Sequence, residues 1–290
     1  MTDSIEILDA SFADVVAPDA QLRVIGKGYR FTEGPTWHDG RQALYFSDIP
    51  NDTILRWTAA DAAPQVWRHP SRRANGNTVD GQGRLVTCEH GSRTVTRTDE
   101  DGNVSTLAST FAGKPLNSPN DVVVDAAGTI WFTDPPYGIK PEASEQRANF
   151  VFRLADGADE PEAVVDHLPR PNGLCFSPDQ RVLYVANSDV DQHNIWRFEV
   201  RDNGTLTDGV IFAVITPGVP DGMRVDRDGR LWSTAGDGVH VFSPAGDLLG
   251  KVHTPRTAAN GTFGGRDHRT LFITATDTVW AIDVNVVGVL

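Results

Sequence analysis

The feature that most constrains the fold is a motif that recurs six times along the chain. Each copy begins with one polar residue and continues as a short apolar run, a polar turn and a second apolar run. The leading residues are Glu33, Asn75, Asn120, Asn172, Asp221 and Asn260. Their spacings, by subtraction, are 42, 45, 52, 49 and 39 residues. Repeats of this length that hold several short strands are typical of a β-propeller with one four-stranded blade per repeat.

Both apolar runs of each repeat are predicted to be strands rather than helices. The turns between them, such as Asp80–Gly83 and Asp226–Gly229, have the residues that tight hairpins need. The second runs are rich in aromatic and β-branched residues, and no window keeps an apolar period of about 3.6 residues. We therefore expect an all-β, six-bladed propeller with four-stranded blades, formed as a single domain by residues 1–290. Residues 1–30 are expected to complete the last blade, with an outer strand from about Leu22 to Tyr29.

The six leading residues are expected to form a ring at one end of the central channel, because the innermost strand of every blade faces that channel. The alternative is that Asn or Asp before Gly is only a turn pair, but this does not explain Glu33. The ring offers two carboxylates, Glu33 and Asp221, together with amide oxygens, and no His or Cys. Such a donor set predicts one divalent cation, with Ca²⁺ expected first and Mg²⁺, Mn²⁺ or Zn²⁺ as alternatives.

The second strand of each hairpin runs back to the same end of the channel, so the residues after it are expected to form the rim of a polar pocket. These segments contain Asp48, Glu89-His90, Asp134, Asp189, Asp237 and Asp277. Asp48 and Asp134 are expected to hold backbone rather than substrate. His90 and Tyr137 are the candidates for contacting substrate, although a rim histidine can equally be merely solvated.

An ordered set of motifs resembles the gluconolactonase, regucalcin (senescence-marker-protein) and arylesterase-like family of six-bladed propellers. The motifs are Glu33-Gly-Pro, Pro119-Asn120-Asp121, Asp134-Pro-Pro-Tyr137-Gly, Pro171-Asn172-Gly and Pro220-Asp221-Gly-Met. The resemblance extends from about Phe31 to the end of the chain. It implies a divalent cation held by Glu33, Asn172 and Asp221, with Asn120 binding directly or through water. It also implies hydrolysis of lactones, usually sugar acid lactones such as glucono-1,5-lactone.

One position departs from the family pattern. Regucalcin-like members hold substrate with an Arg two residues before the third leading residue, and this chain has Ser118 there. Arg73, two residues before Asn75, is the candidate to replace it. The predicted substrate-binding residues are therefore Arg73, Asn75, His90, Asn120 and Tyr137.

The chemistry that fits these residues is metal-assisted transfer of an acyl group to water. Asp221 is the candidate general base, by resemblance to the matching family carboxylate, and its alternative role is that of a ligand only. A catalytic serine is not indicated, since the chain has no Gly-x-Ser-x-Gly motif. Two other hypotheses stay open: that the protein is a related hydrolase of the phosphotriesterase or arylesterase type, and that it is a non-catalytic propeller used as a binding platform. The carboxylates of the ring disfavour the second.

The net charge of −13 argues against nucleic acid and anionic membrane surfaces as partners, so a small-molecule lactone is the expected partner. Neither a basic start nor a long apolar stretch is visible at the N-terminus, and a cytoplasmic protein is expected. Cys88 and Cys175 are expected to be free, buried thiols. The sequence leaves the oligomeric state open.

Overall fold

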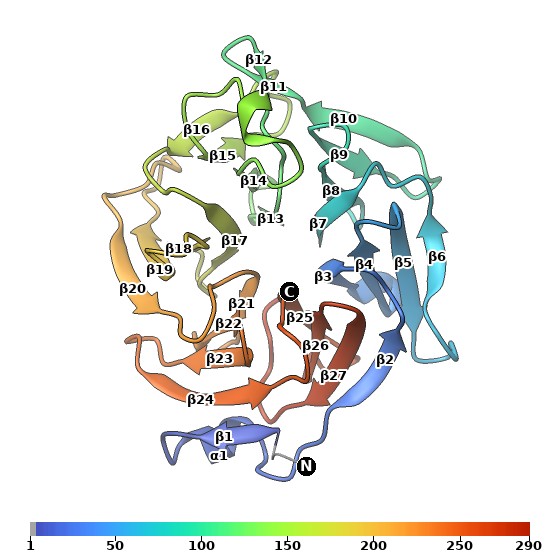
Figure 1. Cartoon of the computed structure of the whole chain (residues 1–290), viewed down its shortest axis with the longest axis vertical. Helices are drawn as coiled ribbons and strands as arrows, with labels where there is room; N and C mark the ends of the chain where they lie inside the picture. The colour runs from blue at the N-terminus through green and yellow to red at the C-terminus, as the bar shows by residue number, and fades with distance from the viewer. Residues whose placement is uncertain (1–3) are drawn as a thin grey trace.

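Six antiparallel sheets, five of them four-stranded and one five-stranded, surround a central channel in the computed structural model, which describes residues 4–290 (Figure 1). The sequence prediction of an all-β, six-bladed propeller is confirmed. The first three blades are formed by β3 (Thr32–His38), β4 (Ala43–Asp48), β5 (Thr53–Thr58) and β6 (Gln65–Arg68); by β7 (Ala74–Val79), β8 (Leu85–Glu89), β9 (Thr94–Thr98) and β10 (Val104–Ala108); and by β13 (Val122–Val124), β14 (Ile130–Asp134), β15 (Phe150–Leu154) and β16 (Glu162–Val165).

The other three blades follow the same order from the channel outward. They are formed by β17 (Pro171–Phe176), β18 (Val182–Asn187), β19 (Asn194–Glu199) and β20 (Val210–Val214); by β21 (Met223–Val225), β22 (Leu231–Ala235), β23 (Gly238–Phe242) and β24 (Leu248–His253); and by β25 (Asn260–Gly264), β26 (Thr270–Ala275), β27 (Thr278–Asp283) and β2 (Arg23–Lys27). A small hairpin, β11 (Thr110–Phe111) and β12 (Lys114–Pro115), connects the second and third blades.

The N-terminal segment closes the ring. Strand β2 pairs antiparallel with β27, with Val24 opposite Trp280, at the place where the sequence predicted an outer strand. Strand β1 (Ile5–Ile7) adds a fifth strand to the fifth blade by pairing with β24, which the sequence did not predict. The short helix α1 (Phe12–Val15) follows it, and the buried Phe12 ring lies where a side chain on Gly250 would project, 2.1 Å from its Cβ position.

Hairpin turns and interblade packing explain why these segments fold as they do. In the turn after β7, the Asp80 carboxylate accepts hydrogen bonds from the backbone N–H groups of Gln82 and Arg84, and Gly83 has a φ of 77°. The equivalent acids Asp125 and Asp226 make the same contacts in the third and fifth blades. Apolar faces of neighbouring sheets bury one another, and their largest fully buried side chains include Trp131 and Trp232.

Cys88 and Cys175 are both free and buried, as expected. Two further short helical turns, η1 (Asp39–Arg41) and η2 (Pro141–Ala143), lie in loops between strands. None of the helical segments within residues 4–290 combines the length and apolar character needed to cross a bilayer.

Candidate active site

A cavity of about 640 Å³ opens at one end of the channel. Five of the six leading residues line it, from five different blades: Glu33, Asn75, Asn120, Asn172 and Asp221. Four of these residues are buried: Glu33, Asn75, Asn120 and Asn172. The predicted convergence of equivalent residues on one site therefore holds for five blades.

Asn260, the sixth leading residue, contacts Glu33 of the neighbouring blade rather than the cavity. It does not line the cavity, and its Nδ2 donates a hydrogen bond to Glu33 Oε2 at 3.0 Å. Pairing of β25 with β26 is regular from Asn260 onward, whereas the first, second and fourth blades have a register shift at or beside the leading residue. Asn260 instead orients a cavity residue.

The glycine that follows most leading residues is explained by close packing around the axis. A Cβ on Gly76 would lie 2.6 Å from the Asn120 carbonyl oxygen, and one on Gly173 would lie 2.2 Å from that of Asp221. Neither glycine has a positive φ. The alternative that Asn-Gly is a turn pair is therefore wrong for these copies, because the next inner strand occupies the space of a side chain.

A chain of hydrogen bonds links the amide residues across the cavity floor. Asn75 Nδ2 donates to Asn120 Oδ1 at 2.7 Å, and Asn120 Nδ2 donates to Asn172 Oδ1 at 2.6 Å. Asn172 Nδ2 donates to Ser188 Oγ at 2.9 Å, and the Ser188 hydroxyl donates to the Pro220 carbonyl. Three blades and the loop before Asp221 are thereby coupled. Asn75 Oδ1 is buried and has no hydrogen-bond partner in residues 4–290.

Glu33 and Asp221 form a pair of carboxylates that burial makes costly to ionise. Burial, and next the charge of Asp121, raise the pKa of Glu33 to about 7. Burial, followed by the charge of Glu33, raises the pKa of Asp221 well above its usual range. A divalent cation fits this site on three counts: two carboxylates that repel each other, amide oxygens beside them, and the unpartnered Asn75 Oδ1.

Asp121 is a third buried carboxylate that the sequence prediction left without a role. It is 2% exposed and stands where the other five repeats have Gly, and its Oδ2 has no hydrogen-bond partner in the described residues. Burial raises its pKa, and the charge of Arg224 is the largest opposing effect. The sequence could have revealed this residue, because Asp121 is the one acid at a repeat position that is Gly in the other five copies.

His90 and Tyr137 both line the cavity, as predicted. His90 is only 7% exposed, and its Nε2 lies 3.1 Å from Asn75 Nδ2. Burial lowers the pKa of His90 to about 4, so its ring is neutral at pH 7 and can accept the amide proton. The alternative of a merely solvated histidine is therefore wrong. Burial, and next the charge of Asp221, raise the pKa of Tyr137 to about 12.

The arginine nearest the cavity is not the one the sequence indicated. Arg73 is exposed and is not among the lining residues, although its carbonyl accepts the His90 N–H at 3.1 Å. Arg170 lines the cavity instead, with its guanidinium carbon 5.7 Å from the centre of the Tyr137 ring. It stands two residues before Asn172, the same offset that singled out Arg73, so the signal was available in the fourth repeat. A substrate role for Arg73 stays a prediction.

The acids that follow the second strands do not all have the same role. Asp134 accepts hydrogen bonds from the N–H groups of Asn117 and Ser118, both at 2.7 Å, and Asp48 accepts those of Arg30 and Phe31, as expected. Asp237 and Asp277 were expected at the rim, but neither lines the cavity. Asp189, which was expected at the rim, does line the cavity. The other rim residues are Phe31, Ile49 and Pro50 of the first blade, Ser188 and Val190 of the fourth blade, and Val219 of the loop before Asp221.

The fold and this cavity define a class: six-bladed propellers with an oxygen-lined site at one end of the channel. The family description "SMP-30/Gluconolactonase/LRE-like region" matches residues 31–277, and the chain belongs to this family. It is 33% identical to a gluconolactonase from Zymomonas mobilis, with 97% of this chain and 85% of the relative covered.

Solved structures agree with this assignment. A gluconolactonase from Xanthomonas campestris superimposes with a TM-score of 0.91 and 40% identity, covering 97% of this chain and 94% of the other. A regucalcin from Agrobacterium tumefaciens, described as a calcium-binding protein, superimposes with a TM-score of 0.80. At 18% identity over 93% and 96% of the two chains, it shows the shared fold only.

Proposed function

We propose that this protein opens the ring of a sugar acid lactone, such as glucono-1,5-lactone, with the help of one divalent cation. Lactone hydrolysis follows from membership of the family and from similarity to gluconolactonases over nearly the whole chain. The sugar acid lactone and the cation are the proposed part. The observation that carries the proposal is the carboxylate pair formed by the buried Glu33 and the partly buried Asp221, which lines a polar cavity together with three asparagine amides.

Calcium is the cation we propose, because all the candidate ligands are oxygens. Glu33, Asn172 and Asp221 would hold it, with Asn120 binding directly or through water. The same ligands also accept Mg²⁺ or Mn²⁺, whereas a site for Zn²⁺ usually has nitrogen or sulfur. A bound dication would polarise the lactone carbonyl and lower the pKa of a water molecule.

The residues of the chain supply the remaining chemistry. Asp221 is the candidate general base: its carboxylate takes the proton of the attacking water as the carbonyl carbon becomes tetrahedral. The Asn75 and Asn120 amides and the Tyr137 hydroxyl can hydrogen-bond the hydroxyl groups of the sugar. His90, neutral at pH 7, orients Asn75 by accepting its amide proton. The Arg170 guanidinium, beside Tyr137, is a further donor at the rim.

The test is activity on a substrate panel before and after removal of cations. Protein stripped with chelator should lose hydrolysis of glucono-1,5-lactone above the spontaneous rate, and Ca²⁺ should restore it. Asp221→Asn should be inactive, whereas Asp189→Asn, an equally conservative change at the rim of the same cavity, should keep most activity. Full activity after chelation would refute the metal mechanism. Faster turnover of aryl esters or phosphotriesters than of any sugar lactone would favour the related hydrolase.

A further inference from the structure

A second ring of equivalent residues lies one layer below the leading residues in the channel. Each member lies on the innermost strand of its blade and pairs with a residue of the second strand. The pairs are Thr36 with Tyr45, Thr78 with Val86, Val123 with Trp131, Cys175 with Tyr184, Arg224 with Trp232 and Thr262 with Phe272. The leading residues pair two positions further along, as Glu33 does with Ser47. Two residues along a strand place the two layers roughly 7 Å apart.

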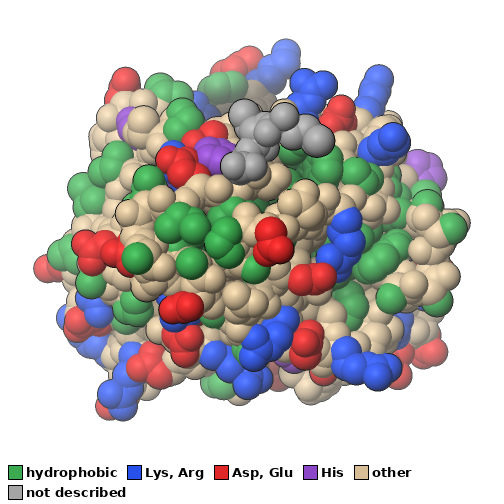
Figure 2. Space-filling view, turned by 90° about the horizontal axis from the view of Figure 1, so that it is seen from below, with side chains coloured by type: hydrophobic (Ala, Val, Ile, Leu, Met, Phe, Trp, Pro, Cys, Tyr) green, Lys and Arg blue, Asp and Glu red, His purple; other side chains and the backbone are tan. Residues whose placement is uncertain are grey.

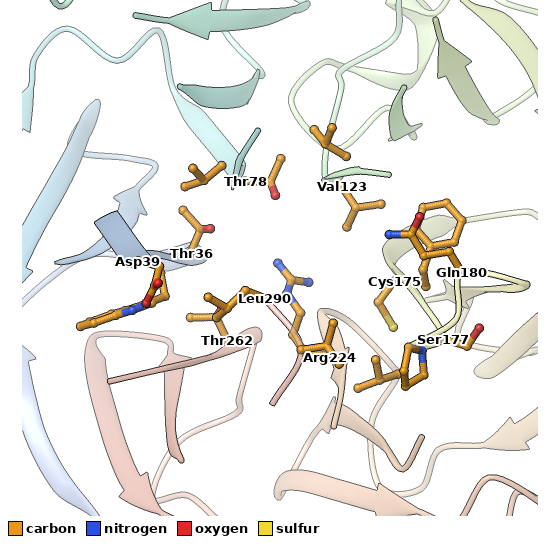
Figure 3. A pocket seen from close by; sticks show the side chains of 17 residues that line it. Thr36, Asp39, Thr78, Val123, Cys175, Ser177, Gln180, Arg224, Thr262 and Leu290 are labelled. Atoms are coloured by element: carbon orange, nitrogen blue, oxygen red, sulfur yellow. The ribbon is translucent and has the colours of Figure 1, made fainter. Parts of the chain in front are cut away.

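All six residues of this lower ring line a separate chamber of about 210 Å³. Figure 3 shows Arg224 reaching into the middle of the ring, with Thr36, Thr78, Val123, Cys175 and Thr262 around it. Arg224 is therefore the one charged member of the lower ring, whereas the upper layer has two carboxylates. The other charged side chain of the chamber lining, that of Asp39, is exposed, and its Oδ1 lies 2.9 Å from His268 Nε2.

Arg224 has few partners for a buried cation. Its side chain is largely inside the protein, with the residue 8% exposed. Its one hydrogen bond within residues 4–290 runs from Nη1 to the Met223 carbonyl at 2.7 Å. No carboxylate of the described chain lies within 4.0 Å of its nitrogens. A guanidinium in this position acts on its surroundings through its charge rather than through a specific ion pair.

The charges of three acidic side chains and Arg224 balance when the acids are ionised and one dication is included. Glu33, Asp221 and Asp121 contribute three negative charges when ionised, and Arg224 contributes one positive charge. The remainder of two negative charges is what one divalent cation neutralises. Without Arg224 the same cation would leave one carboxylate uncompensated in a buried environment, which is costly.

We propose that Arg224 is a fixed counter-charge of the metal centre: it stabilises the channel when no cation is bound and, by the same repulsion, weakens cation binding. It is a positioning residue, since it touches neither the cavity of the active site nor its ligands. The inference rests on the cation in the proposed function. Its sign follows from Coulomb's law at a pH at which the carboxylates are ionised in both proteins, because removing a positive charge from beside a cation site then favours the cation.

Calcium binding by Arg224→Gln, measured by titration calorimetry on chelator-stripped protein, tests this directly. A charge of one and a charge of two about 10 Å apart, at an effective dielectric constant of about 40, change Kd by roughly tenfold. The variant should bind Ca²⁺ about tenfold more tightly and, in chelator, unfold at a lower temperature than wild type. Arg224→Lys, which keeps the charge, and Thr78→Val, which changes a neutral member of the same ring, should bind Ca²⁺ like wild type.

A second arm uses the carboxylate that Arg224 compensates. Asp121→Asn should weaken Ca²⁺ binding by a similar factor, and the double variant Arg224→Gln/Asp121→Asn should return to the wild-type Kd. If Arg224→Gln does not fold, the Ca²⁺ affinities of Arg224→Met and Asp121→Asn test the proposal in its place. An unchanged or weaker affinity in the neutral variants, with wild type binding Ca²⁺, would overturn the inference while leaving the lactonase proposal intact. If wild type binds no divalent cation, the proposed metal fails first.

Discussion

Replacing Glu33 by Gln should separate the stability of the channel from its function. The change keeps the shape of the side chain and removes one of the two repelling charges at the cavity. The pKa of Glu33 rises from 4.5 to about 7 on folding, which corresponds to about 3 kcal/mol of destabilisation when the group is ionised in the cation-free protein. For a chain of this length, that energy shifts Tm by roughly 5 to 10 °C.

The pH dependence gives the sign. The folded protein holds the Glu33 proton more tightly than the unfolded chain, so the cation-free state loses stability as pH rises from about 4.5 to about 7. In chelator at pH 8, Glu33→Gln should therefore melt at a higher temperature than wild type, and at pH 4.5 the difference should vanish. Comparing the two proteins cancels the opposing contribution of His90, which titrates in the same range.

The order of stabilities should reverse when Ca²⁺ is added. Ca²⁺ at about 1,000 times its Kd stabilises the wild type by about 4 kcal/mol, which exceeds the destabilisation of about 3 kcal/mol caused by the charged Glu33. The variant gains little because it lacks a ligand charge. Differential scanning fluorimetry at pH 8, with chelator or with Ca²⁺, measures both effects, and lactonase activity should be lost in the variant under both conditions. A variant less stable than wild type in chelator at pH 8 would show that the pair is not a source of strain.

Three further outcomes follow from the geometry. Arg170→Ala should raise KM for glucono-1,5-lactone severalfold with a smaller change in kcat. Arg73→Ala, which changes a residue outside the cavity lining, should raise KM less. Equal kinetics in Arg170→Ala and wild type would show that Arg170 does not bind substrate. Gly76→Ala should destabilise the fold by about 1–3 kcal/mol in urea unfolding, because the new Cβ would meet the Asn120 carbonyl at 2.6 Å. Gly81→Ala, where nothing lies within 4 Å, is its control and should be close to neutral. His90→Gln should keep the metal and lower activity, measured as Ca²⁺ stoichiometry and turnover, because an amide can replace the acceptor for Asn75 only in part.

The blades and the closing strand were predictable because their signals are local. Turn residues such as Asp80 and Gly83 and the short apolar runs act within one hairpin, so a single sequence contains them. Strand β1 was missed because three residues, Ile5–Ile7, are too few to show a period. Its pairing depends on the edge that β24 offers, a partner more than two hundred residues away.

The site was predictable only as far as the repeats are equivalent. Asn260 differs because its side chain donates a hydrogen bond to Glu33 and does not line the cavity, and the residue type at this position does not reveal that difference. The roles of Asp121 and Arg224 could not be predicted because they depend on the depth at which each buried side chain lies in the channel. Arg170 was overlooked although it has the same offset as Arg73, since exposure at the cavity depends on how each loop leaves its blade.

The pairing of β2 with β27 also orders the steps by which the chain becomes a ring. Val24 and Trp280 face each other although, by subtraction, 256 positions separate them, and contacts of such separation form late because a long loop must close first. On the ribosome, β2 emerges before any blade is complete and must wait, unpaired, until β27 has followed five other blades into solution. Until then the last blade keeps an open edge, a template for strands of other chains. The time that passes between the synthesis of β2 and that of β27 thus decides how long this edge of the nascent protein is exposed to aggregation.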